Sequence, residues 1–250
     1  MIGNRRTVVF LDAMGTLVTL EPWAIAMMRE FTLFSREFDI KFEILSELWS
    51  REWRAVNQDV RKSGHERFRT IRQLFIEAFT STGRKLGVEL KKDYVSDAVE
   101  RVCYYVNNNA VPYPDVHKTL ETLKSQGYMI GVISDADGDD LIHELESARI
   151  LEFFDTVTSS SEAMSYKPNP GIFELALAKM KCTSAQSCHI GDTQEFDVVG
   201  ANRMGLSSFL VTHGKKEVKG TLPQPTYVVK EVSEVVPILK SSRLQVTKNF

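Results

Sequence analysis

Apolar runs rich in β-branched residues recur along the chain and predict the strands of a parallel sheet. The first run, TVVFLD at 7–12, is apolar throughout and ends in an acid, as expected for a strand buried on both faces. Further strands are predicted at 128–134, 155–160, 187–192, 207–212 and 226–230, and helices between or after them at 114–127, 139–149, 170–181, 196–204 and 231–240. This alternation predicts an α/β fold with a doubly wound parallel sheet.

The stretch 21–108 interrupts the alternation with a purely helical pattern. Its apolar residues recur every three or four positions, which places them on single helix faces; they include Phe42, Leu45, Trp49, Trp53, Val56 and Val60, then Phe68, Ile71, Phe75 and Phe79. With 23–37 and 91–106 this predicts about four helices, punctuated by Gly64 and Gly83. We therefore predict that 1–18 and 109–250 form the sheet domain and that 19–108 is a helical insertion.

Composition narrows the class of protein. The 250 residues are 43% hydrophobic and 26% charged with a net charge of −2, which excludes a mainly disordered chain and argues against a general nucleic-acid-binding surface. No apolar run reaches about 18 residues, so no membrane-spanning helix is expected. The cysteines are odd in number and lack metal-ligand spacing. We expect a cytoplasmic protein with reduced thiols, as a monomer or weak dimer.

Three of the predicted strands end in polar residues. The first ends in Asp12, with Gly15 and Thr16 just beyond; the second ends in Ser134 and Asp135; and the fourth ends in Asp192, with Asp197 five residues later. In open parallel sheets, ligand sites lie outside the carboxyl ends of the strands at the topological switch point. We therefore expect these residues to converge, together with Lys167 from the loop after the third strand.

The chemistry of this set is that of a nucleophile beside a cation. The Asp12 carboxylate can attack an electrophilic phosphorus or carbon. Asp12, Asp192 and a backbone carbonyl are hard oxygen ligands suited to Mg²⁺, and Asp197 either ligates or orients a neighbour. Lys167 adds a second positive charge. Ser134, Thr16 and N–H groups of the loop can donate hydrogen bonds to anionic oxygens.

Four segments in order resemble the motifs of the haloacid dehalogenase-like hydrolases. LDAMGTL resembles the first motif, DxDGTL; VIS at 132–134 the second; YKPNPGIFELA the third; and GDTQEFDVVGANRMG the fourth. The resemblance implies a Rossmann-like core, a helical cap inserted after the first motif, and a covalent intermediate on Asp12. It also implies catalytic roles for Ser134 and Lys167, and substrate contacts from Gly15, Thr16 and Asp135.

The first motif departs from that of the family's phosphatases at Met14. These phosphatases carry an acid there, which protonates the leaving oxygen and then activates water. Methionine cannot transfer protons, so only the Met14 carbonyl remains as a metal ligand. Asp135, where Asn is more usual, is a substitute acid or a helix cap, of which capping is favoured; His65 is a weaker candidate acid.

Two other branches of the family also lack this acid. The dehalogenase branch uses no metal, but it has Ser where this chain keeps Asp192. Its characteristic Asn, Tyr and Arg correspond here to Gln194, Phe173 and Ser50, the last beside Arg51. The phosphonoacetaldehyde hydrolase branch needs a cap lysine, for which Lys41 and Lys62 are candidates.

We therefore predict a Mg²⁺-dependent hydrolase of a small phosphorylated metabolite that acts through an aspartyl-phosphate on Asp12. The predicted metal positions are Asp12, Met14, Asp192 and Asp197. One alternative is a metal-independent 2-haloacid dehalogenase. Another is a weakly active or non-catalytic member of the family that binds a ligand or a protein partner.

Overall fold

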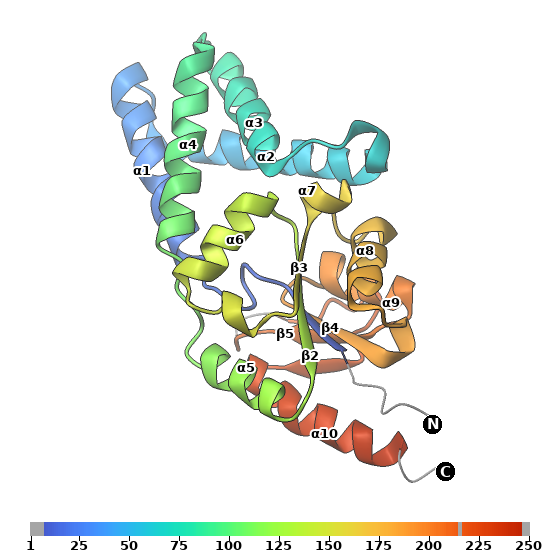
Figure 1. Cartoon of the computed structure of the whole chain (residues 1–250). Coiled ribbons are helices and arrows are strands. Elements are labelled where there is room, and N and C mark those ends of the chain that lie inside the picture. Colours follow the sequence, from blue (N-terminus) through green and yellow to red (C-terminus); the bar gives the residue numbers. More distant parts are fainter. Residues whose placement is uncertain (1–7, 215–216, 247–250) are drawn as a thin grey trace.

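Six parallel strands form one sheet at the centre of the computed structural model, which describes residues 8–214 and 217–246 (Figure 1). The strands are β1 (Val8–Leu11), β2 (Met129–Ser134), β3 (Thr156–Ser159), β4 (Ser187–Gly191), β5 (Ser207–Val211) and β6 (Tyr227–Val229). Their order is β3-β2-β1-β4-β5-β6. The chain runs outward from β1 to β3 and then returns to place β4 beside β1. The predicted doubly wound α/β fold is confirmed, and its switch point lies between β1 and β4.

Helices cover both faces of the sheet. One face packs against α5 (Val116–Ser125), α6 (Gly138–Ser147) and α10 (Val235–Val246), and the other against α8 (Pro170–Met180) and α9 (Val199–Met204). Val9 and Leu11 point to the first face, and Val8 and Phe10 to the second. Side chains alternate along a strand, so a strand covered on both faces must be apolar at every position, as β1 is.

Four long helices separate β1 from α5 and lie together at one end of the molecule (Figure 1). They are α1 (Glu21–Phe38), α2 (Phe42–Ser63), α3 (Ile71–Lys85) and α4 (Lys92–Asn108). We call them the cap. They enclose a core of their own, in which the rings of Phe31 and Phe79 lie 5.5 and 5.9 Å from that of Trp49. The four predicted helices are confirmed; the domain boundaries at 18 and 108 stay a prediction.

The start of α3 differs from the predicted pattern. Phe68 was expected on one helical face with Ile71, but the helix begins at Ile71 because Thr70 caps it. The Thr70 hydroxyl accepts from the Gln73 N–H, and the Gln73 side chain accepts from the Thr70 N–H, which satisfies two first-turn donors. Phe68 instead stacks on Tyr166 at a ring distance of 5.1 Å.

Gly83 does not end a helix as predicted but lies inside α3. A Cβ at this position would come within 2.6 Å of the Leu90 side chain. The segment after the helix folds back closely against it, so a larger side chain at this position would require Leu90 to shift. Two later helices also start elsewhere than predicted: a π-helical turn at Gln194–Val198 precedes α9, and α10 begins at Val235.

Two expectations from composition can be compared with the structure. None of the described helices is both long and apolar enough to cross a membrane. The three cysteines are free thiols: Cys103 and Cys188 are buried and Cys182 is half-buried.

A buried acid in α6 makes the stability of the protein depend on pH. Burial, with a smaller effect of the neighbouring Asp140 charge, raises the pKa of Glu144 from 4.5 to about 7. Between these values the carboxyl is ionised in the unfolded chain but protonated in the folded one. The free energy of unfolding therefore falls as the pH rises through this window, by roughly 1.4 kcal/mol per pKa unit.

We predict that Glu144→Gln removes this loss and stabilises the protein by about 1–3 kcal/mol at pH 8, with little change at pH 4.5. Urea unfolding at the two pH values measures the difference. The control is Glu146→Gln, because Glu146 lies exposed on the same helix. Parallel pH profiles of the wild type and Glu144→Gln would contradict the prediction.

Candidate functional site

Asp12 lies at the end of β1, at the switch point of the sheet. Its N–H donates to the Ile190 carbonyl at 2.9 Å, so the pairing of β1 with β4 extends to this residue. The side chain is only 6% exposed. Thr16 donates its hydroxyl to Asp12 Oδ2 at 3.2 Å. Asp12 is therefore a buried carboxylate in a fixed orientation.

The loop after Asp12 turns back on itself within a few residues. Gly15 has a φ of +88°, and a Cβ there would lie 2.6 Å from Asp192 Oδ2, so glycine is required for both conformation and space. The N–H groups of Gly15 and Thr16 donate to the carbonyls of Val18 and Ala13. These hydrogen bonds favour a role for Gly15 and Thr16 in shaping the loop over direct contact with a substrate.

Lys167 brings a buried positive charge to the same place. Its Nζ donates to Asp12 Oδ1 at 2.6 Å, to Asp197 Oδ1 at 2.7 Å and to the Ile133 carbonyl at 3.2 Å. Burial alone would lower the pKa of Lys167, but the Asp12 and Asp197 carboxylates raise it well above its ordinary value. The ammonium group is therefore charged at neutral pH and joins the ends of three strands or their loops.

Three carboxylates converge on this point from the loops after β1 and β4. Asp12, Asp192 and Asp197 are all buried, and each offers an oxygen within 4.8 Å of the others. Burial raises the pKa of Asp12 well above its usual range; Lys167 opposes this effect, while Asp197 and Asp192 add to it. When all three acids are ionised, the group with Lys167 carries two excess negative charges. This geometry and charge fit a divalent cation with oxygen ligands.

The oxygens of Asp197 already have protein partners. Oδ1 accepts from Lys167 and lies 2.9 Å from His189 Nε2, and Oδ2 accepts from the Thr193 N–H at 3.0 Å. Burial would raise the pKa of Asp197, but Lys167 and His189 lower it below its ordinary value. Asp197 thus remains ionised and holds Lys167, a role that its contacts favour over direct metal ligation.

His189 is a residue of the site that sequence analysis missed. It lies on β4, is fully buried, and faces Asp197. Burial lowers its pKa, so the ring is neutral and donates from Nε2 to the acceptor-only carboxylate. The available signal was an imidazole in the middle of a fully buried strand, two positions before Gly191.

The end of β2 contributes Ser134 and Asp135; the catalytic role of the first stays a prediction, and the second differs from expectation. Ser134 is buried at the end of its strand. The capping role favoured for Asp135 is wrong, because Asp137 occupies the cap position of α6. Asp135 instead accepts from the Lys167 N–H at 2.9 Å and from Arg61 Nη1 at 2.7 Å. Two residues separate Asp135 from the start of α6 at Gly138, so its carboxylate is free to make these contacts.

Polar contacts join the cap to the loop that follows β2. The Asp137 carboxylate accepts from the N–H groups of Ile71 and Arg72, the first residues of α3, at 2.9 and 3.1 Å. The Arg72 guanidinium in turn donates two hydrogen bonds to Asp140. The sequence-based site contained neither these residues nor Arg61, because nothing in a helical pattern indicates which of its polar positions faces another domain.

The candidates from the dehalogenase comparison lie outside this cluster. Phe173 is buried with its ring edge against His189, at a ring distance of 5.3 Å. Gln194 hydrogen-bonds through both side-chain atoms to the backbone of Lys219 and so holds a neighbouring loop. The Arg51 side chain is 67% exposed. The structure thus brings none of these three residues to Asp12.

The other candidates in the cap are exposed to solvent. They are Lys41, Lys62 and His65. Because Asp12 is buried, this arrangement supports neither a Schiff-base lysine from this pair nor His65 as a substitute acid.

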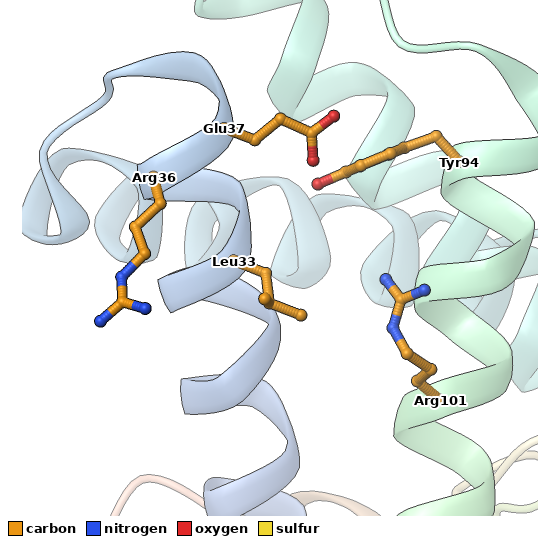
Figure 2. A pocket seen from close by; sticks show the side chains of 5 residues that line it. All are labelled: Leu33, Arg36, Glu37, Tyr94 and Arg101. Carbon is orange, nitrogen blue, oxygen red and sulfur yellow. The ribbon is translucent and has the colours of Figure 1, made fainter.

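A separate groove lies in the cap between α1 and α4 (Figure 2). Arg36, Glu37, Tyr94 and Arg101 line it with Leu33. Arg101 forms a two-pronged ion pair with Glu30, and burial and the nearby Glu37 raise the pKa of Tyr94 to about 12. The charge of Arg101 is therefore paired within the cap, and the groove contains none of the predicted site residues.

Comparisons with known proteins agree with the motifs. Residues 55–211 match the family model described as haloacid dehalogenase-like hydrolase. Glyceraldehyde 3-phosphate phosphatase of Methanothermobacter thermautotrophicus is 32% identical over 153 residues, 58% of this chain and 68% of its own. (S)-2-haloacid dehalogenase 4A of Burkholderia cepacia is 25% identical over 242 residues, 96% of each chain.

A solved structure shows the same fold. The L-2-haloacid dehalogenase of Xanthobacter autotrophicus superposes with a TM-score of 0.73 and 20% identity, covering 94% of this chain and 98% of its own. The match therefore includes the cap as well as the sheet. The relatives include both phosphatases and dehalogenases, so their names do not decide between the two activities.

We predict that Lys167→Met destabilises the protein by about 3–5 kcal/mol at pH 7, because it leaves buried carboxylates without their counter-charge. The loss should shrink toward pH 4 as these carboxyls take up protons. Urea unfolding of wild type and variant at both pH values tests this.

The control for Lys167→Met is Lys85→Met in the cap. Lys85 pairs with Glu52, but its side chain is 49% exposed, so the expected loss is below about 1 kcal/mol. An equal loss in the free energy of unfolding in the two variants would show that the buried ion pair stabilises the protein no more than the exposed one.

Proposed function

Because the chain belongs to the haloacid dehalogenase-like hydrolases, we propose that it is a Mg²⁺-dependent phosphatase of a small phosphorylated metabolite. The observation that carries this proposal is the charge balance at the switch point. Three buried carboxylates face one buried ammonium group, and a divalent cation would neutralise the excess. We retain a cytoplasmic location, a monomeric or weakly dimeric state and the absence of nucleic-acid binding as predictions.

The residues that would hold the ion are Asp12, Asp192 and the Met14 carbonyl. Both side chains are hard oxygen donors close to each other, and Mg²⁺ keeps several waters beside such ligands. Asp197, whose oxygens bind Lys167, His189 and Thr193, holds the lysine in this proposal. A bound ion would lower the pKa of Asp12 and offset the negative charge of a phosphoryl group.

The residues of the chain supply the remaining chemistry. An oxygen of Asp12 attacks phosphorus; the new O–P bond forms as the bond to the leaving oxygen breaks, and that oxygen keeps the electron pair. Lys167 and the Ser134 hydroxyl stabilise the phosphoryl oxygens. Water then attacks the phosphorus of the aspartyl-phosphate, and the bond between Asp12 and phosphorus breaks. Inorganic phosphate leaves with the oxygen and both protons of the water, one of which passes to solvent at neutral pH, and the Asp12 carboxylate is regenerated.

Met14 limits which leaving groups this site can release. Its side chain packs against the apolar cores of both the sheet domain and the cap and cannot donate a proton. General acid–base catalysis typically contributes ~10²–10⁴-fold. The site should therefore favour phosphates whose leaving group departs as a stable anion, over simple alkyl phosphates.

The second candidate function is metal-independent 2-haloacid dehalogenation. It is supported by Met14, since a halide leaves without a proton, and by the relative from Burkholderia cepacia that matches over almost its whole length. In this reaction Asp12 attacks carbon and halide departs with the bonding electrons. Asp192 counts against it, because it adds a buried negative charge beside the nucleophile.

We predict Mg²⁺-dependent release of p-nitrophenol from p-nitrophenyl phosphate, a substrate whose leaving group needs no proton. Asp12→Asn should lower the rate at least ~100-fold, because it removes the nucleophile. The matched control is Asp39→Asn, at an exposed position after α1, which should leave the rate unchanged.

The competing activities give different results in the same experiment. Chloride release from (S)-2-chloropropionate that persists in EDTA, without phosphate release, would identify a dehalogenase. Binding of Mg²⁺ or phosphate with neither reaction would identify a weakly active or non-catalytic member of the family.

We predict that Met14→Asp raises the rate on an alkyl phosphate such as glycerol 3-phosphate by ~10²-fold or more, because it supplies the missing proton donor. The rate on p-nitrophenyl phosphate should change much less. Met28→Asp is the control, since Met28 lies exposed on α1. An equal change on both substrates would show that Met14 does not occupy the position of the acid.

A further inference from the structure

Arg61, near the end of α2, reaches from the cap to the loop that carries Lys167. Its Nη1 donates to Asp135 Oδ2 at 2.7 Å and also to the backbone carbonyl of Lys167. The guanidinium carbon lies 4.0 Å above the Phe196 ring and 5.1 Å above the Tyr166 ring. Two acceptors and two aromatic faces therefore fix a largely buried arginine in one orientation.

The backbone of Lys167 is held on both sides by this pair of residues. Its N–H donates to Asp135 Oδ1 at 2.9 Å, and its carbonyl accepts from Arg61. Its side chain leaves the loop toward Asp12, with 2.6 Å between Nζ and Oδ1. The position of the ammonium group beside the nucleophile thus depends on a loop whose two backbone groups are held by one ion pair.

The neighbours of Lys167 are tied to the cap in the same way. The Tyr166 hydroxyl donates to the Arg69 carbonyl at 2.8 Å, and the Asn169 amide donates to the Arg61 carbonyl at 3.0 Å. Both acceptors are backbone atoms of the cap, so a displacement of the segment 61–69 would break these hydrogen bonds together. Lys167, which lies between Tyr166 and Asn169 in the sequence, is only 2% exposed in this arrangement.

We infer that Arg61 is a positioning residue that makes the placement of Lys167 depend on docking of the cap. With the cap docked, Arg61 and Asp135 hold the backbone of Lys167, and the ammonium group lies against Asp12. With the cap displaced, the carbonyl of Lys167 and the carboxylate of Asp135 lose their common partner, and the loop is released. The site would be complete only after the cap has closed over a substrate.

The inference is tested by hydrogen–deuterium exchange of the full-length protein, read by mass spectrometry. In Arg61→Ala, exchange in the segment 165–169 should accelerate at least ~10-fold, while β4 and β5 keep the wild-type rate, because only a local opening becomes easier. Arg61→Lys keeps a charge opposite Asp135 but not the planar group, so its exchange rate at 165–169 should lie between those of the wild type and Arg61→Ala. Arg51→Ala, an exposed position on the same helix, should match the wild type.

An unchanged rate at 165–169, or an equal acceleration throughout the sheet, would overturn the inference. If Arg61→Ala does not fold, Asp135→Asn provides the same test, because it keeps an acceptor for the Lys167 N–H and removes the charge facing Arg61. Local acceleration at 165–169 is expected there as well, and its absence would again overturn the coupling.

Turnover of p-nitrophenyl phosphate gives an independent measurement, which rests on the proposed phosphatase function. Arg61→Ala should lower kcat ~10-fold or more with a smaller effect on KM, because Lys167 is then misplaced in the closed state. A wild type without turnover would contradict the phosphatase proposal alone, since the exchange experiment requires no substrate. Local loosening of 165–169 with wild-type kcat would overturn the link between loop placement and the function of Lys167.

Discussion

The buried ammonium group of Lys167, between the carboxylates of Asp12 and Asp197, is the interaction on which the site depends. A charge of either sign is costly to bury alone, whereas a lysine that meets two carboxylates and a carbonyl is fully paired. The strands supply the framework for this pairing: β1 positions Asp12, β4 precedes Asp197, and the end of β2 provides the Ile133 carbonyl. A residual negative charge remains and makes this part of the sheet suitable for a divalent ion, which would in turn attract an anionic substrate.

The sheet and the meeting of Asp12 with Asp192 were predictable because they follow from local pattern and from topology. An apolar run such as that at 7–12 has few other places to be buried, and the rule for switch points brings Asp12 and Asp192 together from opposite ends of the chain. A helix start was predictable where the apolar periodicity and a suitable first-turn residue agreed, as at Pro170 of α8. Phe68 shows the opposite case, since the capping box of Thr70 outweighed a continuous apolar period.

The contacts between the cap and the sheet domain could not be predicted in this way. Arg61 lies among many charged residues of α2, and no sequence pattern separates it from Arg51, which faces solvent. Asp135 is a residue type that often caps helices, yet Asp137 occupies the cap position of α6. The Asp135 carboxylate instead accepts hydrogen bonds from Arg61 and from the Lys167 N–H. Such roles depend on how two parts of the chain, each with its own apolar core, contact each other, which periodicity does not encode.

The carboxylate of Asp137, which accepts the first N–H groups of α3, has a consequence for the evolution of the molecule. The first turn of α3 in the cap is capped by Asp137 of the sheet domain, while Arg61 of the cap holds the loop of Lys167 in the sheet domain. Each part of the chain therefore supplies a side chain that fixes the backbone of the other. A chimera that exchanged the four-helix unit with that of a relative would have to carry matching residues at positions 61, 71–72, 135 and 137, so the two halves are expected to diversify as a pair.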